Sequence, residues 1–186
     1  MKYRKPHKIT QRTSSMTNSF VQAVIPWVEP SRQERAEALA KLDMTEEAMK
    51  CVYCDGKATD WDHLRPLVKN KRPTGYISDY KNLVPSCGLC NQSKGASEWK
   101  SWIDGPAPNS PKSRGVNTKP RSEKLERFEA WGNVQPKNLA EMVPSELWAE
   151  HWENLESLID SIKKSQSHAA KIQQAIQRYF SDHHSA

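Results

Sequence analysis

The chain has 186 residues, a formal net charge of +6 and only 36% hydrophobic residues. Its mean hydropathy of −0.85 excludes a large apolar core, and no apolar run approaches the roughly 20 residues that span a membrane. The positive charge suits a polyanionic partner such as nucleic acid. No apolar stretch follows the basic N-terminus, so we expect a cytoplasmic protein without a secretion signal.

The N-terminal third predicts an arm followed by helices. Residues 1–28 begin with a basic, serine- and threonine-rich stretch that lacks apolar periodicity, so we predict a flexible basic arm, with a merely solvated segment as the alternative. Ser31, with Glu34 three residues later, has the pattern of a helix-capping box. Thr45, followed by two glutamates, is a second helix start. Two short helices are therefore predicted between residues 31 and 49.

The C-terminal half predicts a linker and then helices. Residues 104–120 contain four prolines and two glycines, which is typical of a linker or an extended loop. Leu125 and Phe128 predict a helix ending near Gly132, and apolar residues at helical spacing predict further helices over 145–164 and 172–180. Such stripes more often form core than function, and the last two helices are a candidate dimer surface. We divide the chain into an arm (1–28), helices with a cysteine-bearing module (29–103), a linker (104–120) and a helical region for recognition or dimerisation (121–186).

All four cysteines lie in two C-x2-C pairs, Cys51 with Cys54 and Cys87 with Cys90. This spacing is typical of a structural zinc ion held by four thiolates. Two disulfides are the alternative, which the lack of a secretion signal disfavours. Four thiolates saturate one zinc ion. Polar residues between and beside the pairs are therefore free for other chemistry. The four candidates are Asp62, His63, Asn82 and Asn91.

The segment from Cys51 to Gly95 resembles the HNH, or ββα-metal, nuclease family, whose core is a β-hairpin followed by a helix. The resemblance rests on Asp62-His63 closing the first strand, on Asn82 entering the second, and on Cys90-Asn91 with Lys94-Gly95 opening the helix. It implies an α+β fold. The expected fold is a small ββα-metal core with a four-cysteine zinc site, flanked by α-helical N- and C-terminal segments.

Candidate roles follow from chemistry and from this resemblance. His63 is suited to deprotonating water at neutral pH, and the carboxylate of Asp62 is a hard ligand for Mg²⁺ or Mn²⁺. Both can serve one site only if the strand ends or twists there, because adjacent strand residues face opposite sides. The resemblance implies that Asn91 is the second metal ligand and that Asn82 holds the loop and orients His63.

Two features leave these roles open. Asn91 stands where the family name implies histidine, so the preferred metal is not determined, and a residue that merely bonds local backbone at a helix start is the alternative. Basic side chains are expected to contact DNA phosphates, although any of them could be an ordinary surface cation. The candidates are Arg65, Lys69, Lys71, Arg72 and Lys94.

The resemblance implies a metal-dependent endonuclease that hydrolyses phosphodiester bonds of double-stranded DNA. A type II restriction-like enzyme that cuts at a short sequence, alone or as a homodimer, is the first interpretation. A nicking nuclease from a phage or mobile element is the second, and RNA is an alternative substrate. A non-catalytic zinc-knuckle protein that binds nucleic acid is the rival from another class. A protein-interaction module that keeps a relic of the nuclease fold is a further alternative.

Overall fold

The structure is a computed structural model that describes residues 7–183. The chain divides into two compact units. The central unit is Val21–Leu139, and the terminal unit combines Met1–Phe20 with Ala140–Ala186. The basic residues Lys2, Arg4 and Lys5 of the predicted arm lie outside the described residues. Over residues 7–183, no helix has the length and apolar character needed to cross a membrane.

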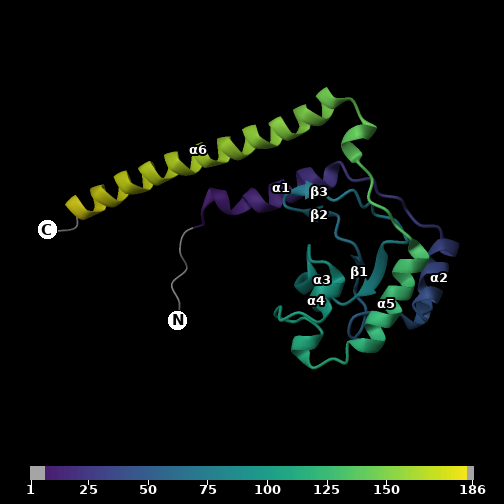
Figure 1. Cartoon of the computed structure of the whole chain (residues 1–186). Coiled ribbons are helices and arrows are strands. Elements are labelled where there is room, and N and C mark those ends of the chain that lie inside the picture. Colours follow the sequence, from purple (N-terminus) through teal and green to yellow (C-terminus); the bar gives the residue numbers. More distant parts are fainter. Residues whose placement is uncertain (1–6, 184–186) are drawn as a thin grey trace. The chain divides into compact units, whose positions relative to one another are not determined.

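The central unit contains a two-stranded sheet followed by a helix. Strands β1 (Asp60–His63) and β4 (Leu83–Ser86) pair antiparallel, with Asp62 opposite Val84 and His63 opposite Leu83. Helix α3 (Gly88–Lys94) follows β4 directly and packs beside β1 (Figure 1). This order confirms the predicted ββα core and the α+β class.

A second, smaller hairpin lies in the connection between β1 and β4. It consists of β2 (Val68–Lys69) and β3 (Arg72–Pro73), which pair antiparallel. The two turn residues Asn70 and Lys71 have φ angles of 51° and 61°. Positive φ at both positions is the geometry of a type I′ turn, whose twist matches that of the strands. The hairpin therefore exposes lysine and arginine side chains at its tip.

Helices surround this core. They are α2 (Arg32–Lys41), η2 (Glu46–Ala48), α4 (Trp99–Ile103), η3 (Lys112–Arg114) and α5 (Lys119–Gly132). The capping box predicted for α2 is present, because Ser31 accepts a bond from the backbone of Glu34 and Glu34 accepts one from the backbone of Ser31. The buried core draws on every part of the unit, including Leu42, Tyr53, Leu64, Val84, Trp99, Trp102, Leu125 and Phe128.

The proline-rich segment 104–120 has local structure in place of an extended path. The buried hydroxyl of Ser110 donates to the carbonyl oxygen of Gly105 at 2.7 Å and accepts from the backbone N–H of Ser113. These bonds lead into η3, and α5 begins at Lys119 within the predicted linker range. Local hydroxyl bonding thus compensates for the backbone donors that proline lacks.

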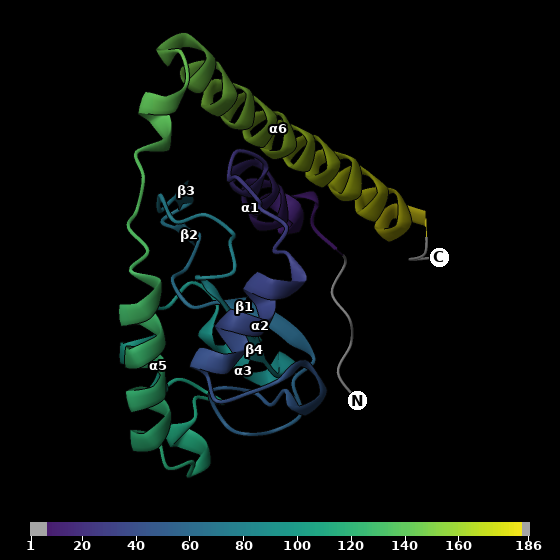
Figure 2. The same cartoon turned by 90° about the vertical axis from the view of Figure 1, so that its right-hand side faces the viewer.

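The terminal unit is helical and differs from the sequence expectation at two places. Where an arm is predicted, η1 (Ile9–Arg12) and α1 (Thr13–Ala23) form, and α6 (Ser145–His183) runs alongside η1 (Figure 2). The backbone N–H of Ile9 donates to Gln166 of α6 at 2.6 Å. Helix α6 is also one continuous helix where two are predicted.

Each difference has a physical reason. The N-terminal segment has little apolar periodicity, and its helix is supported by a partner 157 residues away, which no local pattern reveals. Phe20 and His151 add a ring contact at 5.2 Å. The segment that joins the two predicted C-terminal helices, residues 165–171, contains no glycine or proline, so nothing in it stops the helix. The unit also includes part of η4 (Leu139–Met142).

Candidate zinc centre and active site

The four cysteines meet at one point of the central unit. Their sulfur atoms all lie within 4.8 Å of one another, and those of Cys54 and Cys87 are 3.8 Å apart. Tetrahedral zinc with bonds of about 2.3 Å spaces its sulfurs about 3.8 Å apart. All four cysteines are free thiols, which removes the disulfide alternative. The cluster therefore fits the predicted zinc ion.

Local backbone geometry builds the first half of this cluster. After Cys51 the chain turns tightly, since the backbone N–H groups of Cys54 and Asp55 both donate to the carbonyl oxygen of Cys51. Asp55 takes a positive φ of 58°, and a Cβ at Gly56 would lie 3.4 Å from the sulfur of Cys54. This knuckle presents two sulfurs to one side, while Cys87 and Cys90 arrive from the start of α3.

The ionisation of the clustered thiols favours binding of a cation. A hydrogen bond with Cys90 lowers the pKa of Cys51 to about 5, and the same interaction raises the pKa of Cys90. One thiolate thus makes the ionisation of its neighbour unfavourable, and a divalent ion removes this conflict. The guanidinium of Arg114, from the segment predicted as a linker, donates to the sulfur of Cys90 at 2.8 Å.

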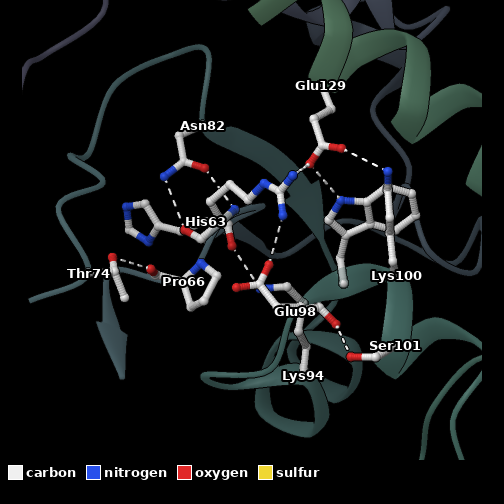
Figure 3. Close-up of polar contacts among 11 residues, drawn as sticks. His63, Pro66, Thr74, Asn82, Lys94, Glu98, Lys100, Ser101 and Glu129 are labelled. Atoms are coloured by element: carbon white, nitrogen blue, oxygen red, sulfur yellow. Dashed lines mark hydrogen bonds and ion pairs between the residues drawn. The ribbon is translucent and has the colours of Figure 1, made fainter. Parts of the chain in front are cut away.

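Asn82 ties together the two ends of the connection between β1 and β4. Its side-chain oxygen accepts from the backbone N–H of Arg65 at 2.8 Å, and its amide donates to the carbonyl oxygens of Arg65 and Ile77 at 3.1 and 3.2 Å. Figure 3 shows Asn82 reaching this segment from one side and Lys94 from the other. With all of these groups satisfied and the side chain buried, Asn82 holds the backbone directly after His63.

Asp62 faces the interior. Its carboxylate accepts from the hydroxyl of Tyr53 at 2.6 Å and pairs with the ammonium of Lys94 at 3.1 Å. The Lys94 side chain is fully buried, and its ammonium also donates to the carbonyl oxygen of His63 at 2.7 Å. Burial raises the pKa of Asp62, whereas the charge of Lys94 and the bond from Tyr53 act in the opposite direction.

His63 faces the other side of β1, as the alternation of a strand requires. Its Nε2 lies 2.8 Å from the hydroxyl of Ser78, and the ring lines a cavity of about 430 Å³. Burial, followed by the nearby charge of Lys94, lowers the pKa of His63 from its ordinary value of 6.5 to about 4. The imidazole is therefore neutral at neutral pH and can accept a proton.

Two of the side chains predicted to contact phosphate form ion pairs with carboxylates of the protein itself. Arg65 forms ion pairs with Glu98 and Glu129, the second of which also pairs with Lys100 at 3.2 Å (Figure 3). Lys94 is buried against Asp62. The other three candidates are exposed on the small hairpin, and these are Lys69, Lys71 and Arg72.

The family model for HNH endonucleases matches residues 51–97, which span both cysteine pairs, β1, β4 and α3. The chain contains an HNH endonuclease domain. The comparison with curated proteins and that with solved structures each gave no match.

Within the HNH domain, the structure shows two neighbours that sequence reasoning did not find. Tyr53 bonds to Asp62, and Ser78 bonds to His63. Tyr53 lies inside the first cysteine pair, where its position gives some indication of a role near the zinc knuckle. Ser78 follows no motif and reaches His63 across 15 residues of chain. The remaining predicted ligand, Asn91, lies half-buried on α3 beside Cys90.

Proposed function

We propose that this protein is a DNA endonuclease in which His63 is the general base. The observation that carries the proposal is the position of His63 at the end of β1 in the ββα core of an HNH domain, where its imidazole borders an open cavity. Its lowered pKa leaves the imidazole unprotonated at neutral pH, so it has a lone pair that can take a proton from water. The exposed lysines of the small hairpin and the overall charge of +6 support a polyanionic substrate.

The proposed step is hydrolysis of one phosphodiester bond. With Nε2–H donating to Ser78, Nδ1 of His63 takes a proton from a water molecule and the hydroxide attacks phosphorus. The bond between phosphorus and the 3′ oxygen breaks, the leaving oxygen takes a proton from solvent, and His63 returns its proton to solvent, which leaves a 5′ phosphate and a 3′ hydroxyl. The hydroxyl of Ser78 at Nε2 restricts the rotation of the imidazole, and Asn82 and Lys94 hold the backbone on either side of it. Such positioning keeps the base within reach of its water, which general-base catalysis requires.

A catalytic divalent ion does not fit the described conformation at Asp62. Oδ2 of Asp62 accepts from the hydroxyl of Tyr53 and pairs with the ammonium of Lys94, and the same ammonium lies 3.4 Å from Oδ1. Binding of Mg²⁺ or Mn²⁺ by Asp62 and Asn91 therefore requires Lys94 to release Asp62. Metal dependence is proposed from the family match, because phosphodiester hydrolysis profits from a Lewis acid near the phosphate.

We further propose restriction-like cutting of both strands by a homodimer. The terminal unit supports this, because the C-terminal half of α6 exposes Ile172, Ile176 and Tyr179 at helical spacing. An apolar helix stripe of this kind suits a two-fold contact, which places two active sites on one duplex. Sedimentation that shows a monomer at micromolar concentration would leave the nicking enzyme as the better candidate.

The function is tested with purified, zinc-loaded protein on supercoiled plasmid, on a linear duplex and on RNA of the same sequence. We expect cleavage of DNA on addition of Mg²⁺ or Mn²⁺ and none after removal of added metal with a weak chelator that leaves the zinc in place. Discrete fragments would support a restriction-like enzyme, and nicked circles a nicking enzyme. Binding without cleavage in any metal would overturn the proposal in favour of a non-catalytic zinc-knuckle protein.

A further inference from the structure

The cavity beside His63 is lined by aromatic rings together with charged and aliphatic side chains. Its volume is about 430 Å³, and Trp27, Trp61 and Tyr80 line it together with the imidazole. This volume lies within the range of small-ligand sites, which is roughly 300–1,000 Å³. We propose that the cavity binds a nucleobase turned out of the DNA stack beside the bond that His63 addresses. The inference rests on the proposed nuclease function and names a binding site that the function alone does not require.

The walls of the cavity are held by the backbone around His63. Trp61 precedes His63 by two residues on β1 and therefore lies on the same face of the strand. Trp27 forms a bridge with Ser78, in which the backbone of Ser78 accepts from Val28 and donates to Pro26. The same Ser78 bonds to the imidazole. The position of each indole relative to the His63 imidazole is therefore fixed, that of Trp61 by strand β1 and that of Trp27 by the backbone of Ser78.

The exposure of these rings indicates a ligand. Trp27 is 66% exposed and Trp61 is 39% exposed, although both are among the largest apolar side chains of the chain. A core role would bury them, as it buries Trp99 and Trp102 in the same unit. The ring of Tyr80 packs edge-on against the ring of Trp131, with the ring centroids 6.0 Å apart. Two exposed indoles and a braced phenol leave flat apolar surface for a planar partner.

Charged side chains of the cavity provide the chemistry to bind the edge of a base. Arg35 and Glu29 contribute a donor and an acceptor to the lining. Arginine pairs with the acceptors of guanine and glutamate accepts from the amino group of cytosine, so the two can read base edges. Arg35 is kept in place by a bond to the carbonyl oxygen of Pro30 at 2.6 Å and by an ion pair with Glu46. A base of the cleaved DNA matches this combination of flat walls and polar groups.

Binding in the cavity must offset the cost of unstacking the base from its neighbours in the duplex. This cost is smallest where the base is already unpaired. Stacking on one aromatic side chain contributes a roughly tenfold gain in affinity, or about 1.4 kcal/mol. A protein with this cavity therefore binds DNA with an unpaired base more tightly than DNA with the same distortion and no base.

The test compares two duplexes that differ by one base. Each contains a single bulged nucleotide, which carries a base in one duplex and is abasic in the other. Affinity is measured with zinc-loaded protein and no added Mg²⁺ or Mn²⁺, so that the DNA stays intact. We expect about tenfold tighter binding of the base-bearing bulge by the native protein. Trp27→Ala and Trp61→Ala should each abolish the preference, and Trp27→Phe and Trp61→Phe should retain most of it.

The controls separate this site from folding and from the nuclease function. Both indoles are exposed, so zinc content should stay unchanged in the alanine variants, and Leu147→Ala, at an exposed apolar residue of α6, should keep the preference. Equal affinity of the native protein for the two bulges would overturn the inference, as would a preference that survives in either alanine variant. Plasmid cleavage with Mg²⁺ is measured separately, so that cleavage without base preference refutes only the cavity, and base preference without cleavage refutes only the nuclease.

Discussion

Replacing Lys94 by methionine should destabilise the central unit by about 3 kcal/mol. The Lys94 side chain is fully buried and that of Asp62 is 6% exposed, with the ammonium 3.1 Å from the carboxylate. Removing one partner of a buried ion pair costs roughly 3–5 kcal/mol, because the other charge stays in a poor environment. We expect the lower end, since Tyr53 still donates to Asp62. Methionine keeps the length of the side chain, so little of the cost comes from lost volume.

The assay is urea-dependent release of zinc to a chromophoric chelator. All four cysteines lie in the central unit, so zinc release reports unfolding of that unit and not of α6. Lys100→Met is the matched control, because Lys100 is 53% exposed and its pair with Glu129 is worth under about 1 kcal/mol. Adding Asp62→Asn to Lys94→Met should recover more than about 1 kcal/mol through the removal of both charges.

The reasoning fails if Lys94→Met is no more destabilising than Lys100→Met. Weaker DNA binding in that stable variant would show that Lys94 reaches solvent and contacts phosphate, as the sequence predicts.

Three further predictions concern proton transfer, zinc and DNA binding. Because the pKa of His63 is lowered to about 4, the base stays deprotonated as pH falls from 8 to 6, and the cleavage rate should not drop with a midpoint near 6.5; such a midpoint in the pH–rate profile would contradict the burial argument. Cys51→Ser should lose zinc and the folded central unit, and retention of both by metal analysis and circular dichroism would remove the structural role of the ion. Lys69→Ala with Lys71→Ala should lower the slope of log affinity against log salt by about 2, whereas an unchanged slope would mean that the hairpin does not touch phosphate.

The sequence predicts the parts of this structure that depend on local chemistry. The two cysteine pairs predict a site for one tetrahedral ion, and the structure brings the four sulfurs together as such a site needs. The backbone turn after Cys51 fits the two-residue gap. The capping box at Ser31 forms because both of its partners lie within four residues. The same locality makes the helix around Leu125 and Phe128 predictable, since one apolar face is enough to bury it.

Contacts across long stretches of chain are not predictable in this way. Lysine is rarely buried, so nothing in the sequence places Lys94 against Asp62, 32 residues earlier. Arg65 forms an ion pair with Glu98, 33 residues later, at a side chain for which the sequence predicts a phosphate contact. Ser78 meets His63 only because the strand and the segment around Trp27 converge. In each case the tertiary partner, and not the residue type, determines the role.

The most direct test of the account is DNA cleavage by His63→Ala beside the native protein and His168→Ala. His168 is an exposed histidine on α6 and serves as the matched control. With equal zinc content and equal DNA affinity, His63→Ala should cleave plasmid at least about a hundredfold more slowly, and His168→Ala should match the native rate. Native-like cleavage by His63→Ala would contradict the assignment of His63 as the general base.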